Sequence, residues 1–136
     1  MKLQLIPGVH RATHRIAIEL ARCPGVSVTQ GEAHILVHLH AQGESSIAQL
    51  HAALAHKRST LTSILDRLVE RKLVTRGVDA GDRRSFRIKL TPAGARAAAK
   101  IHTHLQALES QALESVSPAQ LRAFTALITR LARPLR

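Results

Sequence analysis

Residues 46–91 constrain the fold of this chain more than any other stretch. Apolar residues recur at helical spacing at Ile47, Leu50 and Leu54, and a second amphipathic run follows a polar break at 55–58. A segment rich in basic and turn-forming residues comes next and ends at Leu90-Thr91. Two short helices joined by a tight turn and followed by a charged hairpin are typical of DNA-binding domains. The flanking residues would then hold two copies of this unit at a fixed spacing.

The second helix of the pair, expected over 59–71, has polar side chains at its start. A recognition helix uses its N-terminal residues to reach base edges in the major groove, and short hydroxyl side chains allow close approach. Lys57 and Arg58, directly before the helix, can reach phosphates or guanine. The sequence therefore predicts a base-reading group of four hydroxyl residues: Ser59, Thr60, Thr62 and Ser63.

The hairpin after this helix is predicted to form a wing with a basic tip. Residues 73–76 alternate weakly, 79–82 form a turn cluster, and Phe86, Ile88 and Leu90 alternate with charged residues. An arginine at such a tip suits a narrow minor groove, where the potential is most negative. Asp82 can orient Arg84 through a charge-assisted hydrogen bond.

Positive charge is concentrated in this part of the chain. Residues 57–89 hold ten basic and four acidic residues, a net charge of +6 in 33 residues, against +5 in the other 103. We include Arg67 and Arg87 among the predicted DNA contacts. Such a concentration favours a polyanionic partner. The near absence of aromatic residues, with two Phe and no Trp or Tyr, argues against a base-stacking platform for single strands.

Amphipathic helices are predicted on both sides of this unit, over about 7–22, 30–43, 92–115 and 118–133. Thr29 with Glu32, and Ser117 with Gln120, have capping-box spacing. Pro92 follows a threonine cap at the start of the long helix. No sheet is large enough to cover these helices, so we expect them to be buried against a second copy of the chain.

Length and composition exclude several other classes. The 136 residues suit one domain, and the single Cys23 excludes an internal disulfide framework and fits a reducing compartment. No apolar run approaches the roughly 18 residues of a membrane span, and no signal peptide is evident. We therefore expect a cytoplasmic protein without membrane contact. Glycine-rich phosphate loops, nucleophile elbows and paired carboxylates are absent, so neither an enzyme nor a cofactor is expected.

The sequence resembles the MarR family of bacterial transcriptional regulators. The specific signal is the wing's Asp-x-Arg tip, followed by Leu-Thr and then a glycine, after a helix–turn–helix. Lys72 stands where the family usually has glycine, and His56 stands where it usually has an apolar residue. The likeness covers residues 29–94 and is carried by Thr29 with Ile35-Leu36, by 59–68, by 73–76, by 79–84 and by 90–94.

This resemblance implies an α+β, mainly α, winged helix–turn–helix homodimer that binds a palindromic operator in double-stranded DNA. Residues 29–91 would form the DNA-binding lobe, and 1–28 and 92–136 the dimerisation helices. The four hydroxyl residues would read bases, and Arg84 with Arg83 would enter the minor groove. We expect a repressor of nearby genes that a small-molecule effector releases.

Three alternatives remain open from the sequence. Some members of the family sense zinc with ligands from two regions that here hold Cys23, Glu32, His34, His102 and His104, although His102 and His104 do not share a helix face. Others sense peroxide through a thiol, for which Cys23 is the candidate. The third alternative, from another class, is a basic winged-helix module that binds RNA or an acidic protein.

Overall fold

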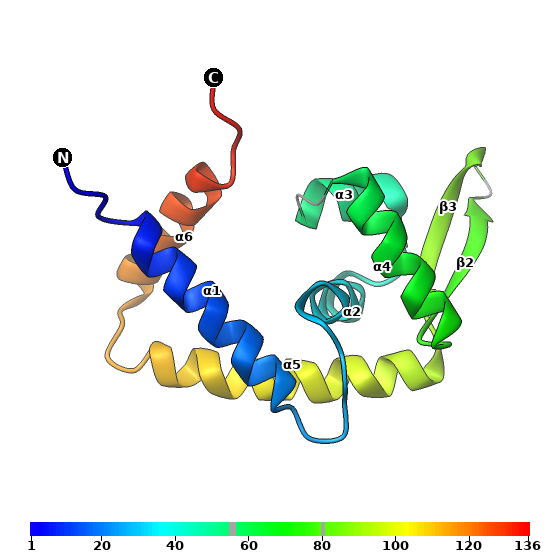
Figure 1. The fold of residues 1–136 in the computed structure, drawn as a ribbon, viewed down its shortest axis with the longest axis horizontal. Coiled ribbons are helices and arrows are strands. Elements are labelled where there is room, and N and C mark those ends of the chain that lie inside the picture. Colours follow the sequence, from blue (N-terminus) through cyan, green and yellow to red (C-terminus); the bar gives the residue numbers. More distant parts are fainter. Residues whose placement is uncertain (55–56, 80) are drawn as a thin grey trace. The chain divides into compact units, whose positions relative to one another are not determined.

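The structure, a computed structural model, describes residues 1–54, 57–79 and 81–136, and it describes 79 and 82–85 by their backbone alone. The chain forms two compact units, 1–105 and 106–136. Helices and one small antiparallel sheet confirm the predicted α+β, mainly α, class (Figure 1). The elements in order are α1 (Ile6–Ala21), α2 (Gln30–Gln42), β1 (Ser45–Ser46), α3 (Ile47–Leu54), α4 (Arg58–Glu70), β2 (Val74–Asp79), β3 (Asp82–Leu90), α5 (Pro92–Ala112) and α6 (Pro118–Leu131).

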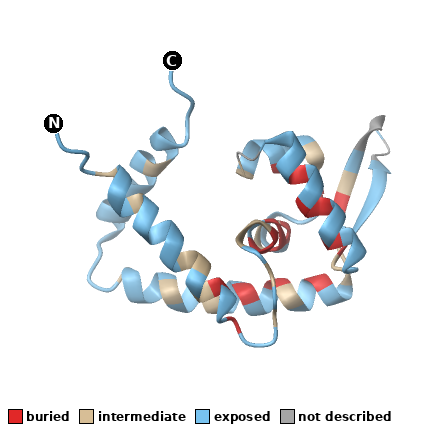
Figure 2. Ribbon diagram, in the orientation of Figure 1, coloured by how far each residue is buried: buried red, intermediate tan, exposed pale blue. Residues whose placement is uncertain are grey.

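Helix α2 is the centre of the first unit. It contacts α1, α3, α4 and β3. Apolar residues cover much of its circumference, and Ala33, Ile35, Leu36 and Leu39 are all buried. Figure 2 shows the buried residues along α2, on α3 and α4, and along the first part of α5. The helix–turn–helix is therefore assembled on α2 as a common support.

Side-chain caps fix where several helices begin. The Thr29 hydroxyl accepts a hydrogen bond from the Glu32 amide at 3.2 Å, and the Glu32 carboxylate accepts one from the Thr29 amide at 3.4 Å. Ser117 and Gln120 form the same reciprocal pair at the start of α6. These pairs satisfy amides that the first helical turn leaves without partners. Both predicted capping boxes are confirmed.

The three strands form a sheet in the order β1-β3-β2, with both pairings antiparallel. Val74 lies opposite Leu90, and Ser45 lies opposite Ile88. Strand β2 extends three residues beyond the expected 73–76, because Gly77 and Val78 continue the ladder with β3. Strand β1 was not expected: its two serines join the sheet through their backbone, which their side-chain types do not indicate.

The base of the wing is closed by contacts between its two ends, residues 72–73 and 91–94, which we call the wing neck. The Thr91 amide donates to the Leu73 carbonyl at 3.0 Å, and the Thr91 hydroxyl donates to the Lys72 carbonyl at 2.7 Å. A Cβ on Gly94 would lie 1.8 Å from the Leu73 carbonyl oxygen, so this position requires glycine. Lys72 has φ +59°, the left-handed conformation that glycine adopts most readily.

The second unit, residues 106–136, contains the end of α5 and all of α6. No residue of α6 is buried. Its apolar side chains at Leu121, Phe124, Leu127 and Leu131 are exposed. In the described ranges, no helix combines the length and apolarity needed to cross a membrane.

Candidate nucleic-acid interface

Helices α3 and α4 form the helix–turn–helix, and α4 exposes the residues predicted to read bases. Leu61, Ile64, Leu65 and Leu68 form the buried stripe of α4. This stripe leaves Ser59, Thr60, Thr62 and Ser63 exposed together with Lys57 and Arg58. Helix α4 begins at Arg58, one residue before the expected start, and its N-cap Lys57 has no side-chain cap bond. The hydroxyl side chains thus lie in the first two turns of α4.

An open depression of about 450 Å³ lies between the start of α2 and the first half of α4. Four hydroxyl residues and one arginine line it, together with a glycine and an isoleucine. Three of the four predicted base-reading residues line it, and Thr62 does not. The complete lining is Thr29, Gly31, Ser59, Thr60, Ser63, Ile64 and Arg67.

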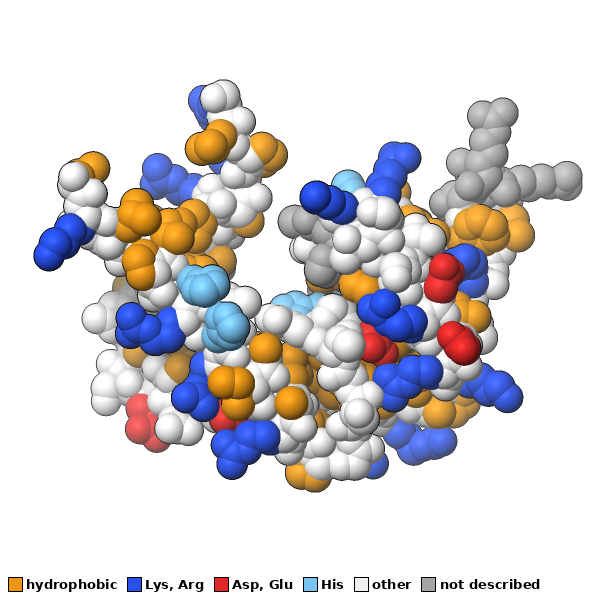
Figure 3. All heavy atoms as spheres, viewed as in Figure 1, with side chains coloured by type: hydrophobic (Ala, Val, Ile, Leu, Met, Phe, Trp, Pro, Cys, Tyr) orange, Lys and Arg blue, Asp and Glu red, His pale blue; other side chains and the backbone are white. Residues whose placement is uncertain are grey.

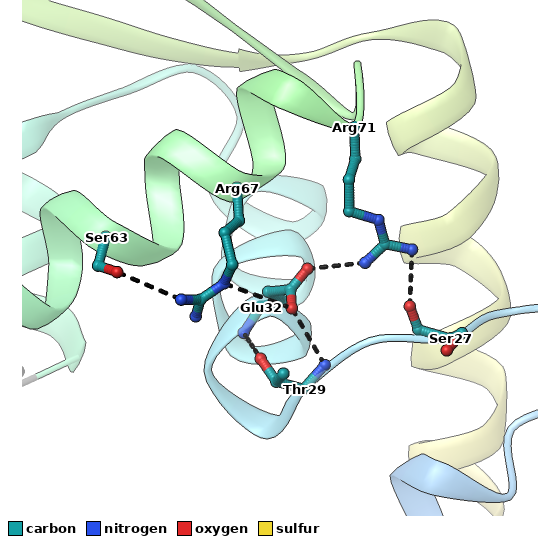
Figure 4. A network of polar contacts seen from close by, with 6 residues as sticks. All are labelled: Ser27, Thr29, Glu32, Ser63, Arg67 and Arg71. Carbon is teal, nitrogen blue, oxygen red and sulfur yellow. Dashed lines mark hydrogen bonds and ion pairs between the residues drawn. The ribbon is translucent and has the colours of Figure 1, made fainter.

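A network of polar contacts joins α4 to the start of α2 (Figure 4). Arg71 Nη1 donates to Glu32 Oε2 at 2.8 Å, and Arg71 Nη2 donates to the Ser27 carbonyl at 2.7 Å. Arg67 Nε lies 4.0 Å from Glu32 Oε1, and its Nη1 donates to the Ser63 hydroxyl at 3.2 Å. Arg67, predicted as a DNA contact, therefore also has partners inside the protein.

The sides of the wing are held by two further arginines. Arg76 on β2 pairs with Asp66 of α4 at 3.1 Å, and its guanidinium lies over the ring of Phe86 at 5.7 Å from the centroid. Arg87 on β3 donates to the Glu44 carbonyl at 3.2 Å and lies 3.5 Å from the Glu44 carboxylate. These contacts fix the orientation of the wing against α4 and the segment before β1. The role of Arg87 as a DNA contact stays a prediction.

The predicted wing-tip group falls where only the backbone is described. Asp82, Arg83 and Arg84 belong to β3, but their side chains lie outside the described part. His56, the residue at the turn, also lies outside it. In the space-filling view, Lys and Arg side chains lie over α4 and beside it, with a few acidic side chains between them (Figure 3). The described surface is therefore suited to a phosphate backbone.

The zinc candidates are dispersed and have other contacts. Cys23 is buried, and its Sγ donates to the Lys100 carbonyl at 3.8 Å. Glu32 binds Arg71, His104 Nε2 lies 2.8 Å from the Glu19 carbonyl oxygen, and the His102 ring lies 5.3 Å from that of His40. Among the described residues, which include His34, no three His, Cys, Asp or Glu side chains lie together as a metal site would require.

Sequence reasoning missed the contact between Glu32 and Arg71. The carboxylate was recognised as half of a capping box, and one of its oxygens does serve there. Its second oxygen faces a helix 39 residues further along the chain. The available signal was an acidic residue near the start of the central helix, but its partner depends on how α2 and α4 pack.

These features together define a winged helix–turn–helix protein with a basic, hydroxyl-rich recognition surface. Residues 25–85 match the model of the MarR family. A transcriptional regulator of Bacillus subtilis, the uncharacterized HTH-type YsmB, is 29% identical over 98 residues, which are 72% of this chain and 67% of YsmB. By these matches the chain is similar to the MarR family of transcriptional regulators, which are DNA-binding winged-helix proteins and not enzymes.

Two solved structures show the same fold. The Staphylococcus aureus MepR–DNA complex superposes with a TM-score of 0.80 at 21% identity, covering 96% of this chain and 97% of MepR. BpsR of Bordetella bronchiseptica, whose DNA binding is regulated by 6-hydroxynicotinic acid, gives a TM-score of 0.75 at 23% identity, covering 96% of this chain and all of BpsR. Both confirm the winged-helix architecture predicted from the sequence.

Proposed function

We propose that this protein is a cytoplasmic homodimeric repressor that binds a palindromic operator near its own gene and is released by a small-molecule effector. The observation that carries the proposal is the start of α4. Its buried stripe directs the hydroxyl group of Ser59, Thr60, Thr62 and Ser63 to the surface, with Lys57 and Arg58 beside them. That arrangement suits base edges in the major groove and the phosphates that border it.

The exposed apolar face of α6 supports dimerisation. Phe124 is 53% exposed and Leu127 is 46% exposed, and Ile6 and Ile18 of α1 are also exposed. Contiguous exposed apolar side chains on a helix favour association, because water contact with them is unfavourable. Residues 1–28 and 92–136 would contribute the interface in this proposal. A two-fold dimer would present two α4 helices to successive major grooves, which explains a palindromic operator.

Release by an effector is proposed by analogy with BpsR, whose regulation involves a small molecule. The physical basis is geometric. Two recognition helices bind together only when their spacing matches the DNA repeat, so a ligand that favours another spacing lowers the affinity.

The test is a fluorescence anisotropy titration with the upstream region of the protein's own gene and a random duplex of equal length. We expect the upstream duplex to bind at least about a thousandfold more tightly at physiological salt. Both affinities should fall steeply between two salt concentrations. Equal affinities for the two duplexes would refute an operator-binding function and favour a general basic interaction module.

A variant pair refines this test. Thr60→Ala removes a hydroxyl from the recognition surface, and we expect it to weaken operator binding about fivefold, the effect of one hydrogen bond of roughly 1 kcal/mol. Thr103→Ala, an exposed threonine of α5, is the matched control and should bind like the unaltered protein. Equal losses in both variants would show that the hydroxyl of Thr60 has no special role.

A further inference from the structure

We propose that Glu32 is a positioning residue for DNA recognition, which keeps Arg67 on Ser63 and away from DNA phosphates. The inference rests on the proposed operator binding. It assigns specificity to a residue that does not itself face the DNA. In this view the buried carboxylate lowers sequence-independent affinity and so raises the preference for the operator.

Burial makes the Glu32 carboxylate dependent on its partners. The residue is 3% exposed, and both carboxylate oxygens have partners. A buried carboxylate is strongly unfavourable unless it is paired and hydrogen-bonded. The positions of Arg67 and Arg71 on α4 are therefore coupled to the start of α2.

Arg71 supplies the fixed part of this coupling. Its two terminal nitrogens bind Glu32 Oε2 at 2.8 Å and the Ser27 carbonyl at 2.7 Å. Planar guanidinium groups held by two acceptors have little freedom to reorient. Because Arg71 is the C-cap of α4, this contact fixes the rotation of the helix at its end (Figure 4).

Arg67 supplies the part that lies on the recognition surface. Its side chain is 48% exposed and lines the depression beside Ser59, Thr60 and Ser63. The guanidinium lies between the Glu32 carboxylate, at 4.0 Å, and the Ser63 hydroxyl, at 3.2 Å. A phosphate contact by this arginine would add affinity for any sequence. Glu32 competes with phosphate for the same charge, and Ser63 then stays oriented for base contact.

The test is Glu32→Gln, because glutamine keeps the length and the oxygen that accepts from the Thr29 amide. Operator and random-duplex affinities are measured across a salt series. We expect the random-duplex slope of log K against log salt to steepen by about 0.9, one additional phosphate contact. The ratio of operator to random affinity should fall about fivefold or more, the discrimination of one base contact.

Three further proteins distinguish this mechanism from a general loss of structure. Glu70→Gln removes an exposed carboxylate from α4, the helix that carries Arg67, and should leave the slope unchanged. Combining Glu32→Gln with Arg67→Ala should abolish the additional slope, because the freed charge is absent. Arg67→Ala alone removes the charge and leaves the Glu32–Arg71 contact intact. Because Glu32 already holds this charge away from phosphate in the unaltered protein, the slope should not change, and this test stands even if Glu32→Gln does not fold.

The inference fails if folded Glu32→Gln, checked by circular dichroism, retains both the slope and the ratio of the unaltered protein. It fails equally if Arg67→Ala alone makes the slope shallower by about 0.9, because Arg67 would then already contact a phosphate in the unaltered protein. A lack of operator preference in the unaltered protein would instead overturn the proposed function. The two failures are therefore distinguishable in one set of titrations.

Discussion

Gly94→Ala should destabilise the protein strongly, although alanine is normally the better helix residue. The added Cβ would lie 1.8 Å from the Leu73 carbonyl oxygen and 2.8 Å from its carbon. Real Cβ contacts shorter than 3.0 Å are essentially unknown, so the two backbones would have to separate by more than 1 Å. The Leu73 carbonyl belongs to the backbone, and the Cβ of alanine is fixed to its own backbone. No change of side-chain rotamer can therefore relieve the contact.

The magnitude follows from the contacts of the wing neck. Separation would break the 3.0 Å hydrogen bond from the Thr91 amide to Leu73 and strain the 2.7 Å bond from its hydroxyl to Lys72. Each bond contributes about 0.5–1.5 kcal/mol, and overpacking costs roughly 1–3 kcal/mol. The gain in helix propensity offsets about 1 kcal/mol. We expect a net loss of about 2–4 kcal/mol in the free energy of unfolding.

Urea unfolding, followed by far-UV circular dichroism at a fixed protein concentration, measures this loss. Gly8→Ala is the matched control, because Gly8 lies in α1 and a Cβ there would meet no atom within 4 Å. That variant should gain about 0.5–1 kcal/mol. A Gly94→Ala protein with an unchanged or higher midpoint would refute the reasoning, since it would mean that the neck opens at little cost.

Three further predictions follow from the wing and α6. Lys72→Gly should raise the free energy of unfolding by up to about 1 kcal/mol, because it relieves a left-handed φ that costs roughly 1–2 kcal/mol but also increases the freedom of the unfolded chain. Lys72→Ala should not raise it, and equal urea midpoints for both variants and the unaltered protein would contradict this prediction. Phe124→Glu should lower the mass measured by light scattering from that of a dimer to that of a monomer, because it places a charge on the exposed apolar face of α6. Thr125→Glu is the control and should leave the mass unchanged. An unchanged mass for both variants would place the interface elsewhere. Arg84→Ala should weaken operator binding without changing the dimer mass, and either undiminished binding or monomerisation would count against a role in the minor groove.

The sequence was sufficient to predict the elements whose causes are local. The capping pairs at Thr29 and Ser117 and the buried stripe of α4 depend on residues a few positions apart. Those patterns, with the motif from 79 to 94, gave the correct fold class and pointed to the family that the comparisons match. Strand β1 was missed because its two serines pair through backbone alone, with residues more than 40 positions away.

The interactions between distant elements could not be predicted in this way. Glu32 was considered as a metal ligand, yet it pairs with Arg71, because the packing of α2 on α4 brings the two together. Lys72 was recognised only as a departure from the family pattern. Its cause, a left-handed backbone at the wing neck, became visible with the contacts of Thr91 and Gly94. Sequence gives residue types and periodicity, whereas these pairings depend on tertiary geometry.

The absence of any buried residue from α6 also links protein concentration to folding. A helix of 14 residues whose apolar side chains are only partly covered has little packing to keep it ordered, and isolated helices of this length are marginal in water. Association would supply the missing burial, so the helical order of residues 118–131 should follow mass action. Dilution would then melt α6 before it unfolds the lobe built around α2. The amount of protein in the cell would thereby set both the occupancy of its DNA site and the fraction of chains in which α6 is folded.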